Sequence, residues 1–412
     1  MKREKQRFLG HLELGKRRFP AQFDVTADSD FRLQIHLQPI SSQAAKEVRA
    51  LMGKPGELVE SLSLNGSNEA GDSFSSDTVD VLGYESISHT PLISVRSAKI
   101  SGLSSQLPRG AAMRLWFRGF RSFRNPKVHS SFGLVEVVGM HRQVDRNEVS
   151  GYVAIHADSD IQLLDWESNA DDLISFLHLG LGFASGKRLQ TPGLQIRIGD
   201  KWVHTYYEGD GFEGSLPPIG YMNHGLLIES MVKRFERAER FPEIFWTVMG
   251  WLNVDTSFHE ARFLMSMTAL ETLCAHVLSK SQGFFISKND YEPLKNSLIG
   301  VVAAAGLDQT QEKVLKGRIS NANARTLHEK LCALRDKYFL PSTTFSDSEI
   351  HGLTKLRNDF VHQGRTKHED SAWNKIVFIR EFLSQIIFRE LGYEGGFISY
   401  LDGYKIARLH RF

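Results

Sequence analysis

An arginine and a histidine stand five positions apart near the C-terminal end of the chain, at Arg357 and His362. The guanidinium is always charged and can bind a phosphate, whereas an imidazole, with an ordinary pKa of about 6.5, can accept or donate a proton at neutral pH. Asn358 precedes His362 by four residues, so on a helix its amide could orient the imidazole ring. These residue types together could cleave RNA without a metal ion.

The spacing alone carries little information. With 29 Arg and 16 His in 412 residues, chance produces about one arginine that is followed five positions later by a histidine. The chain has two such pairs, and the other joins Arg124 to His129 across Pro126. Proline lacks an N–H and clashes with the preceding turn of a helix. We therefore interpret the second pair as a coincidence in a loop of a β-rich region.

Helix signals surround the C-terminal pair. Ser346 or Ser348 is predicted to cap a helix that runs from Asp347 to Val361, with acidic residues in its first turn. Apolar residues at helical spacing are predicted to form its buried stripe: Leu353, Leu356 and Phe360. The pair is therefore expected on a helix that packs against a core.

Arg357 and His362 do not share a face of a regular helix. Five residues at 100° each place them about 140° apart around the axis, too far for both to hold one phosphate. Three arrangements could bring them together. Arg357 reaches around the helix, the helix loosens at His362, or a second copy of the chain supplies half of the site.

Arg357, Asn358 and His362 resemble the Arg-x4-His signature of HEPN domains, which usually has a polar residue after the arginine. The segment Ala269–Leu273 lies on a predicted helix that is similar to the first core helix of the family, and Ser257–Glu260 is a capping box that opens it. Within the family the chain looks most like the Apea-like subgroup, in which a β-rich region precedes the HEPN domain. Members of that subgroup serve in bacterial anti-phage defence. The resemblance covers roughly residues 225–395.

The resemblance implies an all-α, usually homodimeric module that cleaves RNA without a metal ion or cofactor. His362 would carry the proton, Arg357 would hold the non-bridging phosphate oxygens, and Asn358 would position either of them. The 2′-hydroxyl of RNA would attack the adjacent phosphorus and leave a 2′,3′-cyclic phosphate. The expected partners are therefore an RNA substrate and a second copy of the chain. A toxin-like effector of this kind could respond to a phage-derived trigger at its N-terminal domain.

Two carboxylates are candidate auxiliaries. Glu271 lies on the predicted first core helix, where it could face the site, but a glutamate on a helix surface is more often solvated or ion-paired. Asp359 lies close to His362 around the helix and could simply be exposed. In a degenerate site Arg357 would cap carbonyls, and His362 would only end the helix, where the helix dipole favours positive charge.

A second region invites a nucleic-acid interpretation. Residues 114–124 interleave arginines with aromatic residues, a combination that can hold phosphates and stack on unpaired bases. Arg114, Arg118 and Arg121 are therefore candidate RNA contacts. We favour a different interpretation, in which the rings belong to a sheet core and the arginines line its solvent face.

The periodicity of the chain changes along its length and predicts an α+β protein. Residues 1–207 alternate between apolar and polar positions, which indicates an antiparallel β-rich domain, either a sandwich or an open barrel. If the chain is an effector of the kind that the family resemblance implies, this domain would be its sensor or regulatory part. Residues 208–225 are rich in turn-forming residues and are predicted to be a linker. Residues 226–395 have helical spacing and are predicted to form an all-α, HEPN-like bundle, and 396–412 a terminal hairpin. The serine-rich stretch 61–76 is predicted to be a loop.

Composition narrows the class of protein. The two cysteines, Cys274 and Cys332, exclude a disulfide framework and favour a reducing cytoplasm. No cysteine or histidine pattern indicates a zinc site, and no apolar run is long enough for a membrane span. A formal net charge of +2 gives no overall attraction to nucleic acid, so any RNA contact needs a local basic patch.

Three hypotheses of different kinds remain open on the sequence alone. The chain is an endoribonuclease effector, a catalytically inactive HEPN module that binds RNA or a nucleotide, or an interaction scaffold whose helices only dimerise. The presence of Arg357, Asn358 and His362 together favours the first.

Overall fold

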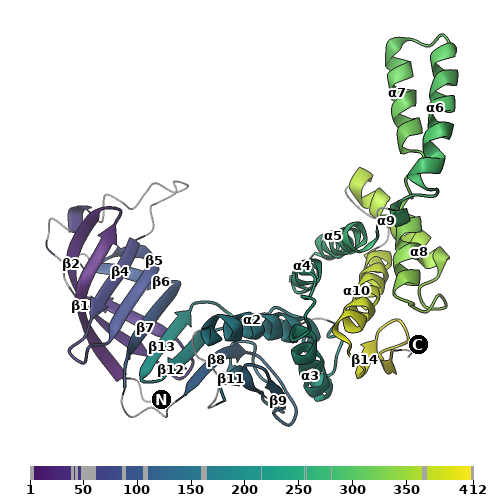
Figure 1. The fold of residues 1–412 in the computed structure, drawn as a ribbon. Helices are drawn as coiled ribbons and strands as arrows, with labels where there is room; N and C mark the ends of the chain where they lie inside the picture. The colour runs from purple at the N-terminus through teal and green to yellow at the C-terminus, as the bar shows by residue number, and fades with distance from the viewer. Residues whose placement is uncertain are drawn as a thin grey trace. The chain divides into compact units, whose positions relative to one another are not determined.

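The computed structural model describes residues 4–38, 41, 45–47, 62–85, 90–104, 110–158, 165–214, 216–254, 256, 258–279, 281–363 and 369–409. They form two compact units, which Figure 1 draws as a ribbon. The first unit contains residues 1–215 and 219–238, and the second contains residues 216–218 and 239–412.

The first unit is built on one antiparallel sheet of 13 strands. Its strands have these bounds: β1 Glu4–Leu14, β2 Arg17–Ala27, β3 Leu33–Leu37, β4 Leu62–Ser67, β5 Ser73–Tyr84, β6 Pro91–Val95, β7 Ser97–Leu103, β8 Ala111–Arg118, β9 Lys127–Ser130, β10 Gly133–Val138, β11 Val149–His156, β12 Gly193–Ile198 and β13 Lys201–Tyr207. The order across the sheet is β3-β2-β1-β4-β5-β7-β13-β12-β8-β11-β10-β9, and β6 pairs with β5 beside this path. The predicted antiparallel region is confirmed. The predicted serine-rich loop is wrong, because its two halves pair as β4 and β5.

The N-terminal part of the sheet curls around an aromatic core. Phe8 and Phe23 stack with ring centroids 5.6 Å apart, and Phe74 lies 5.1 Å from Phe23. All three are almost completely buried. The curl brings β3 close to β6, although these two strands do not pair. The described strands therefore resemble an open barrel more than two stacked sheets.

Two helices belong to the first unit. Helix α2 (Trp166–Ala184) packs on β8 and β11, where His178 stacks on Phe117 of β8 at 5.6 Å. Helix α3 (His224–Phe235), which follows the short 3-10 turn η1 (Tyr221–Asn223), packs on α2 and β9. Its Phe235 lies 5.8 Å from Phe176 of α2. The sequence predicts this helix in the helical domain, but its aromatic contacts put it with the sheet, so the first unit ends at Ala238 rather than between residues 208 and 225.

The second unit is helical, as predicted. Its elements are α4 Glu243–Leu252, α5 His259–Val277, the 3-10 turn η2 Ser281–Gly283, α6 Lys288–Ala304, α7 Gln309–Asn321, α8 Leu327–Lys337, α9 Asp347–Gln363, α10 Glu369–Leu391 and the hairpin of β14 Gly396–Ser399 and β15 Lys405–Arg408. Helix α5 packs against α4, α8, α9 and α10, which makes it the central helix of the unit. The terminal hairpin was predicted, whereas α6, which contains Pro293, was not.

Candidate functional site

The candidate site lies where α9 crosses α5. Ser346 caps α9, since its hydroxyl accepts a hydrogen bond from the Glu349 N–H at 3.2 Å. The predicted apolar stripe of α9 is buried, and its Phe360 packs against Phe263 of α5 with ring centroids 4.9 Å apart. This ring contact fixes the rotation of both helices and therefore which polar residues meet beside it.

Arg357 of α9 meets Glu271 of α5 beside that core contact. The Arg357 Nε donates to Glu271 Oε1 at 2.9 Å, and Nη2 donates to Oε2 at 3.4 Å. Each side chain is 32% exposed, so the pair lies at the edge of the core and still reaches solvent. The Nη1 group of Arg357 donates to Asn358 Oδ1 at 3.4 Å. Three of the five residues that the sequence indicated on these two helices are thus in contact with one another.

This ion pair does more to fix the orientation of the Arg357 guanidinium than to stabilise the fold. A carboxylate that takes a guanidinium from its side, through Nε and one terminal nitrogen, holds the guanidinium plane fixed. A partly exposed ion pair contributes on the order of 1 kcal/mol or less to folding. A guanidinium has five N–H groups, and the contacts with Glu271 and Asn358 use three. Among the described residues, two donors therefore remain for a ligand such as a phosphate.

His362 continues the same helix. The backbone of α9 is helical through Gln363, so position 362 keeps its place about 140° around the axis from Arg357. The His362 side chain lies outside the described residues, as does Gly364. The helix does not loosen before His362, which leaves the other two arrangements, a reaching arginine or a second copy of the chain. Asp359 is half-buried, and Asn358 is exposed.

The three arginines of residues 114–124 do not form one patch. Arg118 is buried and donates to the main-chain carbonyls of Asn147 and Asp30. Arg121 lies over the ring of Tyr221 at 4.2 Å. Only Arg114 lies on the open face of the sheet, because its neighbours Met113 and Leu115 point into the core. Arg118 thus holds loops together. The three arginines have different surroundings and do not form a shared surface for RNA.

Arg124 and His129, the other arginine–histidine pair, do not lie on a helix, in agreement with the interpretation based on Pro126. Arg124 and Asn125 have positive φ values of 61° and 41°, which belong to a turn, and His129 lies in strand β9. The two residues are therefore separated by a change of secondary structure and share no helix.

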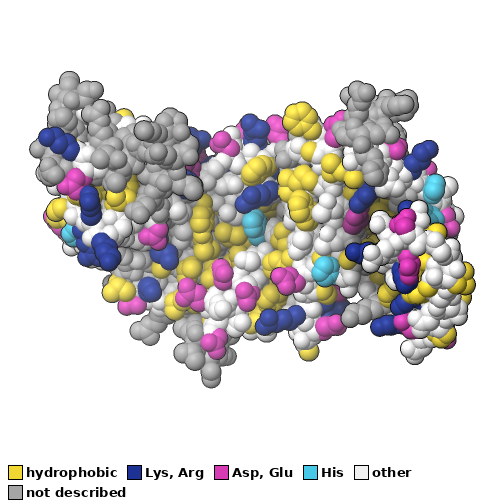
Figure 2. All heavy atoms as spheres, turned by 90° about the horizontal axis from the view of Figure 1, so that it is seen from above, with side chains coloured by type: hydrophobic (Ala, Val, Ile, Leu, Met, Phe, Trp, Pro, Cys, Tyr) yellow, Lys and Arg dark blue, Asp and Glu magenta, His cyan; other side chains and the backbone are white. Residues whose placement is uncertain are grey.

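The remaining chemistry-bearing residues have structural environments. Burial raises the pKa of the Cys274 thiol to about 12, and burial together with Asp347 raises that of Cys332 to about 11, so both are poor nucleophiles. Within the described residues, no three His, Cys, Asp or Glu side chains gather as metal ligands would. None of the described helices has both the length and the apolar character that a bilayer crossing requires. Figure 2 shows basic and acidic side chains interspersed on the face in view, in keeping with the small net charge.

Comparison of the chain with family models, with curated proteins and with solved structures finds no match. The candidate site therefore depends on its own geometry. Sequence reasoning indicated Glu271 but not its contact with Arg357, because the two residues are 86 positions apart. A group of residues around Arg197 was not predicted either, because only the register of β12 against β8 brings it beside Ala112 and Arg114.

Proposed function

We propose that the chain is a metal-independent endoribonuclease of HEPN type that acts in the cytoplasm, as a toxin-like effector in anti-phage defence. The observation that carries the proposal is the side-on contact of Glu271 with Arg357. It holds a guanidinium at a solvent-accessible edge, five residues before a histidine on the same helix. A purely structural ion pair would not require this neighbour.

In the proposed reaction each residue has one task. His362 removes the proton of the 2′-hydroxyl or protonates the departing 5′-oxygen, assistance worth about 10²- to 10⁴-fold in rate. The two free N–H groups of Arg357 bind the non-bridging oxygens and stabilise the charge that develops on them. The bond from phosphorus to the 5′-oxygen breaks as the 2′-oxygen bond forms. The products are a 2′,3′-cyclic phosphate and a 5′-hydroxyl.

Glu271 and Asn358 act through Arg357 in this proposal. Glu271 fixes the guanidinium plane before substrate binds, so that no orientation has to be acquired during the reaction. Asn358 holds Nη1 from the side. Since α9 keeps Arg357 and His362 on different faces, we propose that the complete site forms between two copies of the chain. Each copy would then contribute one of the two groups to each crevice.

The alternative functions remain distinguishable from this one. An inactive module would bind RNA or a nucleotide without cleaving it, and a scaffold would dimerise without binding either. The remaining N–H groups of the partly exposed Arg357 side chain favour binding of a phosphate over a scaffold alone.

The deciding experiment compares wild type with His362→Ala and Arg357→Ala on total RNA in EDTA, followed by mapping of the new ends. We expect wild type to leave cyclic phosphates and both variants to lose at least about 100-fold in rate. The matched control is His351→Ala, because His351 is an exposed histidine on the same helix and is outside the motif.

Two outcomes would refute the proposal. The first is equal cleavage by wild type and His362→Ala, and the second is activity that appears only after magnesium is added. If the activity depends on an N-terminal trigger such as a phage component, the same series is repeated in phage-infected cells that express each variant. Loss of protection with His362→Ala but not with His351→Ala is the expected result there.

A further inference from the structure

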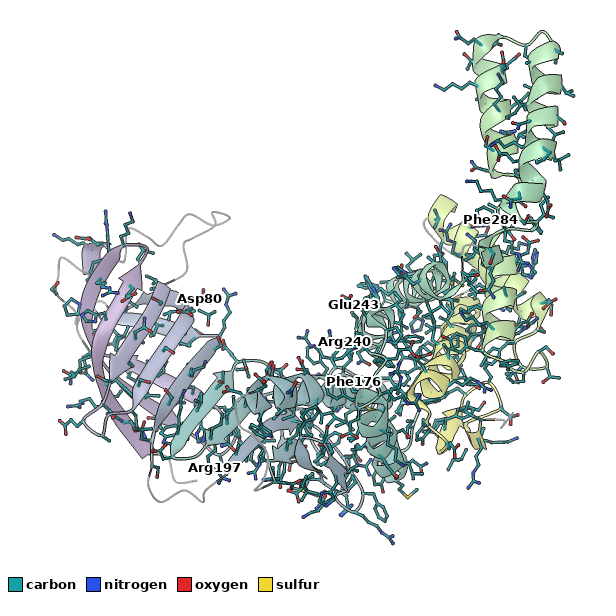
Figure 3. The ribbon with its side chains drawn as sticks, viewed as in Figure 1. Asp80, Phe176, Arg197, Arg240, Glu243 and Phe284 are labelled. Atoms are coloured by element: carbon teal, nitrogen blue, oxygen red, sulfur yellow. The ribbon has the colours of Figure 1, made fainter. Side chains whose placement is uncertain are left out.

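Around β8, helix α2 covers one face of the sheet of the first unit, and none of the described helices α2 to α10 packs on the other face. Met113, Leu115 and Phe117 of β8 point toward α2, and Phe117 stacks on His178 of that helix. Because side chains alternate along a strand, Ala112, Arg114 and Trp116 point the other way. In Figure 3 Arg197 likewise lies below the sheet, whereas Phe176 belongs to α2 above it.

Strand register gathers a specific set of residues on this open face. Ala112 of β8 stands opposite His156 of β11 on one side and Arg197 of β12 on the other. Arg197 in turn stands opposite Trp202 of β13. The small side chain at position 112 therefore leaves a hollow between an imidazole and a guanidinium. The cavity has a volume of about 180 Å³, and its lining includes Ala112, Arg114, His156, Arg197, Trp202 and His204.

Positive charge exceeds negative charge around this hollow. No carboxylate pairs with Arg114 or Arg197 among the described residues, and the Nε atom of each is buried without a hydrogen-bond partner. Two carboxylates lie nearby, and both have other partners. Glu136 is engaged by Lys127 at 2.9 Å and by the Tyr152 hydroxyl at 3.2 Å, and it lies 3.9 Å from His156 Nε2. Asp72, which lies beside Trp202 next to Gly102, accepts a hydrogen bond from Asn68 Nδ2 at 2.9 Å. Such unpaired cations side by side repel each other, and a bound anion would relieve the repulsion.

His156 lies within electrostatic reach of both arginines. Its pKa is lowered chiefly by burial; Glu136 acts to raise it, and Arg114, Arg197 and Lys127 act to lower it. These cations are therefore close enough to act on one imidazole. At neutral pH the ring is uncharged and can donate or accept a hydrogen bond at the hollow.

Aromatic contacts hold this group in place. The Arg114 guanidinium lies over the ring of Tyr152 at 4.4 Å, and the Trp116 Nε1 donates to Gln195 Oε1 at 3.1 Å. Trp202 and His204 lie beside the hollow, with ring centroids 4.9 Å apart. Both rings are partly buried, and Trp202 also packs against the aromatic core of the N-terminal strands. An anion and an adjacent planar group could therefore be contacted together.

We propose that this face binds single-stranded nucleic acid, with one phosphate in the hollow between Arg114, Arg197 and His156 and a neighbouring base against Trp202 and His204. The hollow is smaller than the roughly 300 Å³ at which small-molecule pockets begin. It can take a phosphate but cannot enclose a whole nucleotide, so the ligand continues across the sheet. Stacking on aromatic rings next to a basic groove is how sequence-tolerant single-strand binders work.

The test measures binding by fluorescence anisotropy with a labelled oligothymidine in EDTA. This DNA probe lacks the 2′-hydroxyl, so binding can be measured whether or not the second unit cleaves RNA, and failure of one proposal leaves the other intact. Arg197→Gln is expected to weaken binding about tenfold. It should also make the slope of log affinity against log salt shallower by about 0.7, the contribution of one phosphate contact. Arg197→Lys, which keeps the charge, should retain most of the affinity.

Two further variants separate a specific hollow from general attraction. Ala112→Leu fills the hollow without changing charge and should weaken binding severalfold. Lys99→Gln removes a positive charge from an exposed residue on the opposite face of the same sheet and should change little. Equal losses in Lys99→Gln and Arg197→Gln, or unchanged binding in Ala112→Leu, would overturn the proposal. So would a mononucleotide or inorganic phosphate that binds as tightly as the oligonucleotide.

Discussion

Two pairs of helices in the second unit are supported in different ways. Helices α5 and α9 bury large apolar side chains between themselves and their neighbours, including Phe263, Leu270 and Phe360. Helices α6 and α7 form a hairpin in which only Tyr291 is buried among the described residues. In Figure 1 this hairpin extends away from the other helices of its unit. The same secondary structure is thus stabilised by a core in one place and by local bonds in the other.

Local bonds account for the hairpin. Ser287 caps α6 and Asp308 caps α7 through side-chain hydrogen bonds to main-chain N–H groups. At the base, Asn323 Nδ2 donates to the Ile286 carbonyl at 2.9 Å, and its Oδ1 accepts from the Ile286 N–H at 3.0 Å. Phe284, labelled at this base in Figure 3, forms an isolated antiparallel bridge with Ala324. Short helices without a buried face are only marginally stable in water, so these contacts must provide much of the stability of the hairpin.

The comparison bears on function. A polar pair that must be held within a fraction of an ångström needs helices whose rotation is fixed by packing. Arg357 and Glu271 lie on such helices, next to the Phe263–Phe360 contact. The hairpin offers no comparable support, and the proposed active site does not include it.

The largest expected effect is from truncating the core contact between α5 and α9. Phe360→Ala should lower the free energy of unfolding of the second unit by about 3–5 kcal/mol, because it removes a buried ring and leaves a cavity. Chemical denaturation measures this loss. The buried Cys274 thiol should also become more reactive toward an alkylating reagent, since it becomes accessible only when the core opens.

The neighbouring residue provides the control for that prediction. Val361 is 55% exposed on the same turn, so Val361→Ala should change stability by less than about 0.5 kcal/mol. Equal losses in the two variants would mean that α9 is not held by its apolar stripe, and the support inferred for Arg357 would disappear with it.

An intermediate effect is expected at the base of the hairpin. Asn323→Ala removes two hydrogen bonds to the main chain of Ile286, a loss of about 1–3 kcal/mol in total. The loss should be local. Amide hydrogen exchange should accelerate across residues 288–321 and remain unchanged in α5. The control is Asn321→Ala, at an exposed position at the end of α7.

A contrary pattern would be equally informative. If Asn323→Ala accelerates exchange in α5 as much as in the hairpin, the two regions unfold as one cooperative unit. The distinction between core-held and locally held helices would then be wrong.

The elements that sequence analysis located well are those whose signals are local. Helix α9 was predicted from residue 347 to 361, because a serine cap and a stripe at helical spacing lie within the segment itself. Helix α6 was missed because Pro293 lies inside it, although Ser287 and the later spacing of Leu294, Leu298 and Val301 were available as signals.

Local sequence patterns could not predict the features that depend on packing between distant segments. Helix α3 was placed in the wrong unit because only the folded chain brings Phe235 against Phe176. Likewise, no local sequence pattern predicts that Glu271 contacts Arg357, or that Arg197 lies opposite Ala112 in the sheet. The residue types at the candidate site could be predicted from the sequence, but the contacts between them could not.

The smallest effect is expected on the apolar side of α6. Val301 is 69% exposed, and with Leu294 and Leu298 it lies along one side of the helix, about 100° from the side that faces α7. Val301→Ser should therefore change the stability of the monomer by less than about 0.5 kcal/mol, even though it replaces an apolar residue with a polar one. Val302→Ser, one position on and half-buried toward α7, should cost more. If denaturation instead shows a large loss for Val301→Ser, something covers that side of α6, and the hairpin is supported by burial after all.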